Sequence, residues 1–391
     1  MASAEFSERT SRLKPEGAYQ VLARAGQMEA GGRHIIHFEI GQPDFDTPEN
    51  IQLAGVQAIE SGRTRYTPPA GMPSLQTAIA AETSRRYNLD VLPEEVVVGP
   101  GAKPALFFPT LALVQPGDEV IYPDPGFPTY EAMIRVAGGQ PVAVPLREEN
   151  DFSFDLQVFD QKINPRTRLI ILNSPGNPTG GVIPLADLQH IAARAQSNDS
   201  WVMSDEIYAR IAFDGLRVPS IFALPGMKER TILVDGFSKT YAMTGWRLGY
   251  GVMPAALARR VELLLTHSVG STAHFTQYAG LEALHGPQHA VDAMLAEYQH
   301  RRDVIVAGLN NIPGVSCRKP QGAFYVFPNI RGTGLSSSQA ADLILEKAGV
   351  ALLPGSAFGE YGEGYLRLSY ATSIDNIECG LEAIRRVLEK A

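Results

Sequence analysis

Short apolar runs alternate with segments of helix length between about residues 93 and 251, and this alternation limits the fold more than any other feature of the chain. Strands that are buried on both faces are apolar along nearly their whole length. Strands that are separated by helices form mostly parallel sheets with helices on both faces. We therefore predict an α/β fold with a mostly parallel central sheet. The five predicted strands cover residues 96–98, 119–122, 169–172, 201–204 and 231–234.

The segments on either side of this region have a different pattern. A chain of 391 residues is too long for one compact core, so we expect two domains. A long predicted helix over residues 290–309 is followed by isolated strands and further helices, which is typical of an α+β domain. We predict residues 1–45 as an N-terminal arm and part of the small domain, residues 46–285 as the large domain, and residues 286–391 as the smaller α+β domain.

Three local signals precede the large domain. A helix is predicted over residues 15–30, because Gly31 and Gly32 provide a stop. The alternation over residues 34–40 predicts a strand. Thr47 is predicted to cap a helix whose first residue is Pro48.

Composition argues against several classes of function. The net charge of −8 is spread along the chain without a basic patch, which argues against nucleic-acid binding. No stretch of about 18 apolar residues is long enough to span a membrane, and the first thirty residues contain no secretory signal. Cys317 and Cys379 lack metal-ligand spacing and form no disulfide framework. We expect a soluble cytoplasmic protein that has no metal site.

Unusual residues follow each predicted strand of the central sheet. Ligands of such sheets gather outside the carboxyl ends of the strands. After the last predicted strand comes Ser238-Lys239, with Arg247 eight residues after the lysine. Lysine forms Schiff bases when its amine is held neutral, and arginine binds phosphate as a planar fork of donors. The other strand ends provide the glycine-rich segment Gly99–Leu106, the aromatic Phe127, the proline-rich loop Asn173–Gly180, and the pair Asp205 and Tyr208.

Each of these residues has a simpler explanation when it is taken alone. Lys239 can be an exposed loop lysine, because most lysines are exposed. Asp205 can be a helix N-cap, and Phe127 can be a buried aromatic in a turn. Together, however, they provide an amine, a carboxylate, a phenol, an amide, a ring and a phosphate cup. These are the groups that pyridoxal 5′-phosphate (PLP) requires, because the cofactor needs an imine and an anion at its ring nitrogen.

The motifs Asn177–Gly180, Ser204–Tyr208 and Ser238–Arg247 resemble those of the class I/II aminotransferases, which are PLP-dependent enzymes of fold type I. The resemblance extends from Gly41 to Tyr370 and is strongest to the bacterial aspartate aminotransferase branch. It implies that Lys239 forms the Schiff base and moves the proton. The implied catalytic residues are Lys239, Asp205 and Tyr208. The implied cofactor ligands are Gly101, Ala102, Lys103, Phe127, Asn177, Asp205, Tyr208, Ser238, Lys239, Arg247 and Tyr66, the last of which reaches the neighbouring subunit of a homodimer.

The resemblance also implies a substrate site. Arg367 matches the arginine that binds the α-carboxylate, and Lys103 matches a lysine that is associated with a distal carboxylate. Gly41, Asn173 and Asn177 match positions near the substrate. An acidic amino acid such as aspartate is therefore the expected donor. A plain solvated role for Lys103 is the alternative.

Two departures affect the expected pocket. Phe127 stands where tyrosine or tryptophan is more usual, so stacking is kept and a polar contact is lost. Gly176 and Pro104 replace bulkier or polar residues, which changes the pocket edge.

The expected reaction is transamination between an L-amino acid and a 2-oxo acid such as 2-oxoglutarate, in ping-pong fashion through pyridoxamine phosphate. A lyase, cyclase or oxidase on the same scaffold is the alternative, because the cofactor provides the chemistry and the pocket selects the bond that breaks. A non-catalytic regulator with this fold is disfavoured, because every catalytic position is filled.

Overall fold

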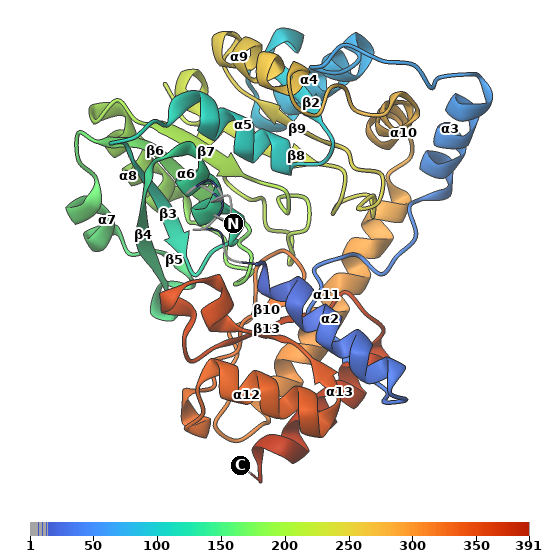
Figure 1. Cartoon of the computed structure of the whole chain (residues 1–391), viewed down its shortest axis with the longest axis vertical. Coiled ribbons are helices and arrows are strands. Elements are labelled where there is room, and N and C mark those ends of the chain that lie inside the picture. Colours follow the sequence, from blue (N-terminus) through green and yellow to red (C-terminus); the bar gives the residue numbers. More distant parts are fainter. Residues whose placement is uncertain (1–6, 8–9, 11–12, 14, 391) are drawn as a thin grey trace, which may run out of the picture.

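The computed structural model describes residues 7, 10, 13 and 15–390. The other residues, which include most of the predicted arm before residue 15, lie outside the described part. The predicted mostly parallel sheet is present (Figure 1). It has eight strands in the order β2-β9-β8-β7-β6-β3-β4-β5. Its strands are β2 (Val96–Gly99), β3 (Glu119–Asp124), β4 (Gln140–Arg147), β5 (Ser153–Phe154), β6 (Thr167–Asn173), β7 (Trp201–Asp205), β8 (Thr231–Gly236) and β9 (Gly249–Val252).

Five neighbouring strands of this sheet, β4, β3, β6, β7 and β8, run parallel. β9 is antiparallel to both β8 and β2, and β5 is antiparallel to β4 at the other edge. The sequence analysis missed β4, β5 and β9. β4 contains Pro141 and Pro145, and β9 contains Gly249 and Gly251, and both residue types weaken a strand signal.

Alternate residues of the central strands face opposite helical layers. Ile171 in β6 belongs to an apolar cluster with residues of α5, α6 and α9. Its neighbour Ile170 belongs to a second cluster with residues of α7 and α8. The sheet is therefore buried on both faces, which explains why its strands are apolar throughout. The helices around it are α3 (Glu49–Glu60), α4 (Pro73–Tyr87), α5 (Lys103–Leu113), α6 (Thr129–Ala137), α7 (Leu156–Lys162), α8 (Leu185–Ser197), α9 (Ala255–Thr266) and α10 (His274–His285).

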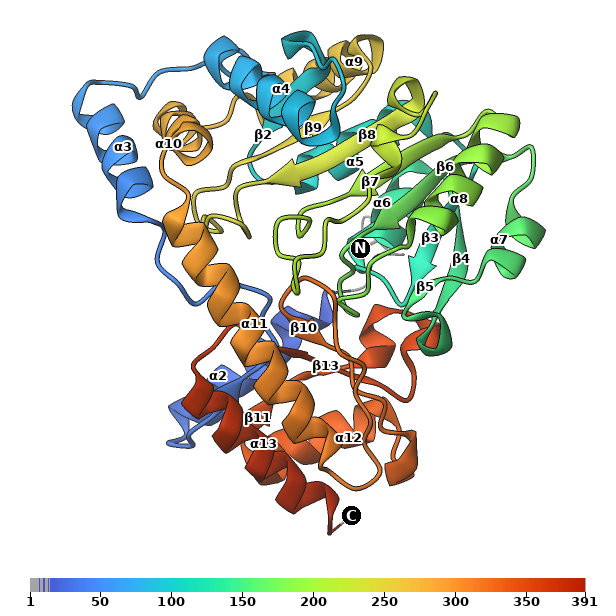
Figure 2. The same cartoon turned by 180° about the vertical axis from the view of Figure 1, so that it is seen from behind.

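The lower part of the molecule contains two small sheets and the helices α2, α11, α12 and α13 (Figures 1 and 2). The parallel pairing of β1 with β11 places the N-terminal segment beside the C-terminal part of the chain. On this basis we propose that the predicted domain boundaries apply, with residues 1–45 and 286–391 in the small domain. The elements are α2 (Gly17–Ala30), β1 (Ile36–His37), α11 (His289–Asn310), β10 (Tyr325–Val326), α12 (Ser337–Leu343), β11 (Val350–Ala351), β12 (Leu353–Pro354), β13 (Leu366–Ser369) and α13 (Ile374–Leu388).

Two local predictions were wrong. The strand predicted over residues 34–40 has only two residues, Ile36 and His37. Thr47 does not cap α3, because Pro48 is the N-cap. The Thr47 hydroxyl donates instead to the carbonyl of Ala242 at 2.7 Å and accepts from the Trp246 indole at 3.0 Å. It therefore ties the start of α3 to the loop that follows Lys239.

Over the described residues, no helix is both long and apolar enough to cross a bilayer.

Candidate active site

Lys239 lies in the turn after β8 and points inward rather than into solvent. Its Nζ donates to the carbonyl of Gly41 at 2.6 Å. It also lies 6.0 Å from the ring centroid of Tyr208 and 5.7 Å from that of Phe324. Burial lowers the pKa of Lys239 to about 8, and the nearby Arg367 and Arg247 contribute to this lowering. The simpler explanation of an exposed loop lysine is therefore wrong.

Asp205 is buried at the end of β7 and is not a helix N-cap, because no helix follows it. Its Oδ2 accepts a hydrogen bond of 2.7 Å from the Tyr130 hydroxyl. Burial raises the pKa of Asp205 to about 6, and the hydrogen bond from Tyr130 opposes this rise. A positive group beside the carboxylate would favour its ionised form.

Asn173, at the end of β6, lies directly opposite Asp205 in the sheet. Its amide nitrogen donates to the Asp205 carbonyl at 3.0 Å, and its Oδ1 accepts from the backbone N–H of Asn177 at 2.8 Å. The Asn177 side chain in turn accepts from Arg367 at 3.3 Å. A chain of hydrogen bonds thus joins the end of β6 to β13 of the small sheet.

Arg367 in β13 is almost fully buried. Its guanidinium donates to the carbonyl of Glu39 and lies 4.6 Å from the ring centroid of Tyr325 and 5.0 Å from that of Phe358. Its Nε has no hydrogen-bond partner among the described residues. A buried donor of this kind costs free energy unless something pairs with it, so an anionic ligand fits here.

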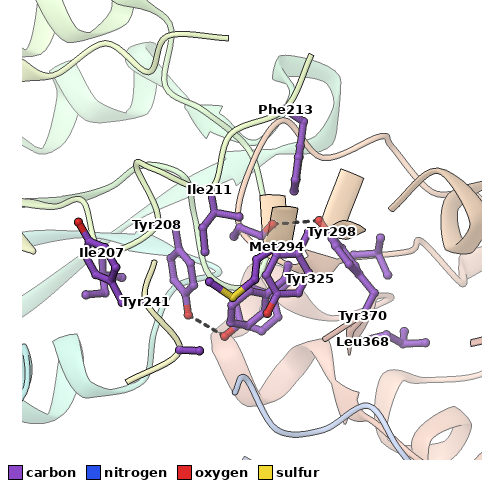
Figure 3. Packing of buried hydrophobic residues seen from close by; sticks show 14 of the residues in the cluster. Ile207, Tyr208, Ile211, Phe213, Tyr241, Met294, Tyr298, Tyr325, Leu368 and Tyr370 are labelled. Atoms are coloured by element: carbon purple, nitrogen blue, oxygen red, sulfur yellow. Dashed lines mark hydrogen bonds between the residues drawn. The ribbon is translucent and has the colours of Figure 1, made fainter. Parts of the chain in front are cut away.

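Tyr208 and Tyr325 form a pair on the wall of the site. Their hydroxyl oxygens are 2.7 Å apart, as the dashed line in Figure 3 marks. Gly41 lies beside this pair, because a Cβ at that position would be 1.9 Å from the Tyr325 hydroxyl. The site therefore requires glycine at residue 41.

The segment between β2 and α5 forms a cup next to Arg247. Gly101 has a positive φ of +87°, and a Cβ there would lie 2.1 Å from Arg247 Nη2. A Cβ at Gly249 would lie 2.5 Å from the backbone nitrogen of Ala102. Gly101 and Gly249 thus allow the backbone before α5 and the Arg247 guanidinium to lie close together. Ser238, which precedes Lys239 in the chain, is also buried. Backbone N–H groups at the start of α5 suit a phosphate.

Lys103 and Phe127 lie at the edge of the site. Lys103 Nζ is 5.3 Å from the centroid of the partly buried Phe127 ring. The same Nζ is 3.2 Å from Glu16 Oε2. Lys103 is therefore exposed to solvent and also has a carboxylate partner, so the solvated role stays open beside the proposed one.

Tyr66 is separate from the other predicted residues. It is 98% exposed. The structure does not bring it together with Lys239 within one chain.

Sequence reasoning missed Tyr130, Tyr325, Glu39 and Glu16. Tyr130 follows Phe127 by three residues, so one turn of chain places both at the site, and that spacing was the available signal. The other three come from the N-terminal segment and the small domain. No local pattern marks them, because only tertiary folding brings them to the strand ends.

The described residues fit PLP. Lys239 provides a buried amine of lowered pKa, and Asp205 provides a buried carboxylate. The cup of Gly101, Ala102 and Arg247 provides donors for a phosphate. Arg367 provides the unpaired donor for a substrate anion.

Comparison with known proteins agrees with this chemistry. The family model described as "Aminotransferase class I and II" matches residues 33–384. The chain is 41% identical to an aspartate aminotransferase of Pyrococcus horikoshii, over 98% of this chain and 97% of the relative. The solved structure of the aspartate aminotransferase from Rhizobium meliloti matches with a TM-score of 0.95 at 34% identity, covering 99% of each chain. An aromatic aminotransferase from Pyrococcus horikoshii OT3 matches with a TM-score of 0.89 at 40% identity, covering 94% of this chain and 99% of that one.

An α/β fold with a buried lysine, a carboxylate and a phosphate cup at its strand ends is that of a PLP-dependent enzyme. The chain belongs to the class I and II aminotransferases, and it is a PLP-dependent transaminase.

Proposed function

We propose that this transaminase takes the amino group of an acidic L-amino acid, with aspartate as the leading donor, and passes it to a 2-oxo acid such as 2-oxoglutarate in two ping-pong half-reactions. The observation that supports an acidic donor is a set of three cationic side chains, Arg367, Arg247 and Lys103, that contribute to the lowered pKa of Lys239. Arg247 is assigned to the phosphate, which leaves Arg367 and Lys103 for the substrate. Two cationic groups suit a substrate that has two carboxylates.

In this proposal the α-carboxylate binds Arg367, whose Nε is available, and the distal carboxylate binds Lys103. Asn173, Asn177 and Gly41 border the substrate. The support comes from the hydrogen bonds that join Asn173 to Asn177 and Asn177 to Arg367. These bonds fix the guanidinium before the substrate arrives, and such preorganisation favours binding.

PLP, when bound, supplies an electron sink for the substrate α-carbon. Lys239 Nζ would take the proton from that carbon and deliver it to the cofactor carbon, so that the amino group stays with the cofactor. The lowering of the Lys239 pKa to about 8 enlarges the neutral fraction of the amine that can act as a base. Asp205 holds the pyridine nitrogen protonated, and Tyr130 orients Asp205. Tyr208 and Asn177 bind the ring oxygen, and Phe127 covers the ring. Ser238, Arg247 and the backbone of Gly101, Ala102 and Lys103 bind the phosphate.

We also propose that the enzyme acts as a cytoplasmic homodimer in which Tyr66 reaches the partner's phosphate site. Support comes from the exposure of Tyr66 and from the exposed apolar side chains Leu53, Val56 and Ile59 on α3. A groove of about 560 Å³ beside Arg247 and Trp246 provides room for a neighbouring subunit. Light scattering on the purified protein tests the dimer, and a monomer at micromolar concentration would contradict it.

The test of the reaction is the visible absorption of the holoenzyme during titration with a panel of amino acids and then with 2-oxoglutarate. We expect aspartate or glutamate to bleach the yellow band, and 2-oxoglutarate to restore it. If neutral amino acids bleached the yellow band and acidic ones did not, the proposal of an acidic donor would be contradicted. Release of ammonia without a 2-oxo acid would contradict the proposed ping-pong transfer.

A further inference from the structure

Lys103, which is the proposed ligand of a distal carboxylate, already has a carboxylate partner within the chain. Glu16 Oε2 lies 3.2 Å from Lys103 Nζ. The Lys103 side chain is 52% exposed and that of Glu16 is 27% exposed, so the pair lies at the border between the site and solvent. Over the described residues, Glu16 is the only acidic side chain that forms an ion pair with Lys103. A substrate carboxylate that binds Lys103 would therefore compete with Glu16 for the same amine.

Packing holds Glu16 in this place. Glu16 is the N-cap residue of α2, and the next residue is Gly17. A Cβ at Gly17 would lie 3.2 Å from Ala357 Cβ, so the helix starts in close contact with the segment before Phe358. Ala18 and Val21 of α2 pack against the apolar cluster that contains Phe358. The start of α2 is therefore fixed against the same segment that covers Arg367.

The charge of Glu16 also acts on the substrate side of the site. Burial raises the pKa of Tyr325, and Glu16 adds to this rise. Burial lowers the pKa of Arg367, and Glu16 is among the neighbours that oppose the lowering. The charge of Glu16 is therefore felt at both Tyr325 and Arg367, in addition to its ion pair with Lys103.

We propose that Glu16 is a specificity-determining residue, a built-in counter-carboxylate that an acidic substrate must displace from Lys103. This inference rests on the proposed transamination and concerns the side chain that the pocket accepts. A neutral amino acid binds beside an intact and nearly neutral Glu16–Lys103 pair. An acidic amino acid has to break the pair and is repelled by Glu16, so Glu16 restrains the acidic preference that Lys103 would otherwise give. The pocket thus admits neutral side chains as well as acidic ones.

The experiment compares the wild-type holoenzyme with Glu16→Gln, using L-aspartate and L-phenylalanine as donors. The ratio of kcat/KM for aspartate to that for phenylalanine is expected to rise about fivefold, which corresponds to the upper value for a partly exposed ion pair. The matched control is Glu378→Gln, an exposed carboxylate on α13. The control is expected to leave the ratio unchanged.

Equilibrium binding provides a readout that does not depend on turnover. Calorimetry with succinate, a dicarboxylate that cannot react, should show about fivefold tighter binding to Glu16→Gln than to the wild type. Binding of 3-phenylpropionate should be unchanged. In a Lys103→Gln background the effect of Glu16→Gln should be clearly smaller, because only the repulsion between Glu16 and the substrate remains once the pair is absent.

Three outcomes would overturn the inference. The first is a ratio that changes by less than twofold, and the second is an equal loss with both donors, which would indicate only a structural role. The third is the same rise in the Lys103→Gln background, which would indicate a general charge effect. The proposal of an acidic donor is tested independently of the role of Glu16. It would be wrong if the wild type used phenylalanine and were inert with aspartate. Succinate binding still decides the role of Glu16 in that case.

Discussion

The Tyr130 hydroxyl donates a 2.7 Å hydrogen bond to Asp205 Oδ2, linking the first turn of α6 to the end of β7. Both side chains are buried. This hydrogen bond favours the ionised carboxylate, whereas burial raises its pKa to about 6. Tyr130 is therefore a positioning residue, which acts on the cofactor through Asp205.

Replacing Tyr130 by phenylalanine is expected to raise the pKa of Asp205 further. One hydrogen bond to a charged group contributes about 1.5 kcal/mol, which corresponds to roughly one pH unit. The carboxylate is then protonated up to a higher pH, so the acid limb of the kcat/KM profile should move upward by about that amount. Tyr122→Phe, on strand β3 of the same sheet, is the matched control. An unshifted acid limb in Tyr130→Phe would show that the bond has no such role.

Removal of the Lys239 amine is expected to stop the reaction. Lys239→Ala should lower kcat by about 10³-fold, because it removes the amine that is proposed to move the proton. The variant should still bind PLP through the phosphate cup, which equilibrium dialysis measures. A variant that transaminates at near the wild-type rate would refute the role given to Lys239.

The lowered pKa of Lys239 also has a consequence for the stability of the apoenzyme. The pKa falls from 10.5 in the unfolded chain to about 8 in the folded one. Between these values the unfolded chain binds one more proton, so this group makes stability increase with pH over that window. Below pH 8 the buried charge is fully unfavourable. Lys239→Met should therefore be more stable than the wild-type apoenzyme at pH 7, by on the order of 1–3 kcal/mol.

The measurement is urea unfolding of both apoproteins from pH 7 to pH 10.5. The difference between their free energies of unfolding should be constant below pH 8 and should decrease above pH 8. A difference that does not depend on pH would mean that packing, and not the amine charge, distinguishes the two proteins.

The sequence predicted the central sheet, and it identified candidate residues at the strand ends, because both depend on local patterns. Buried strands are apolar in any context, and Asn173 and Asp205 end two such strands while Lys239 lies three residues after a third. The sheet then brings them together, since the carboxyl ends of parallel strands share one edge. β9 was not predicted because it contains two glycines, which weaken a strand signal. Gly249 allows the close approach to Ala102, and Gly251 lies against Met253 and Ala105.

Contacts between distant segments could not be predicted in this way. Glu16 is 87 residues from Lys103, and Glu39 is 328 residues from Arg367. Nothing in the local sequence of Glu16 or Glu39 distinguishes it from other glutamates. Their roles depend on how the N-terminal segment lies against β11 and the small domain, which is a property of the folded chain.

Arg86 compensates two buried carboxylates beneath the site. Its guanidinium lies 3.3 Å from Asp235 Oδ2, and its charge opposes the rise in pKa that burial causes in both Asp235 and Glu206. Arg86→Met is expected to lower the free energy of unfolding by about 3 kcal/mol, because removing one partner leaves buried charge unpaired. Arg85→Met, on the exposed face of the same helix, should cost less than about 0.5 kcal/mol. Equal losses in the two variants, measured by urea unfolding, would contradict this prediction.

Gly41 is placed where no other residue fits without movement. Its carbonyl accepts from Lys239 Nζ, and a Cβ would lie 1.9 Å from the Tyr325 hydroxyl. Gly41→Ala should therefore displace Tyr325 from Tyr208 and shift the carbonyl that orients the amine. A misplacement of about 1 Å can cost about 10²-fold in rate, so kcat/KM should fall by roughly that factor.

Gly26→Ala is the matched control, because a Cβ at this position on α2 meets nothing within 4 Å. The Gly26→Ala variant should keep full activity and gain slightly in stability, since alanine favours a helix more than glycine does.

Wild-type kinetics in Gly41→Ala would contradict this prediction. That result would mean that Tyr325 moves freely and that its pairing with Tyr208 does not shape the site.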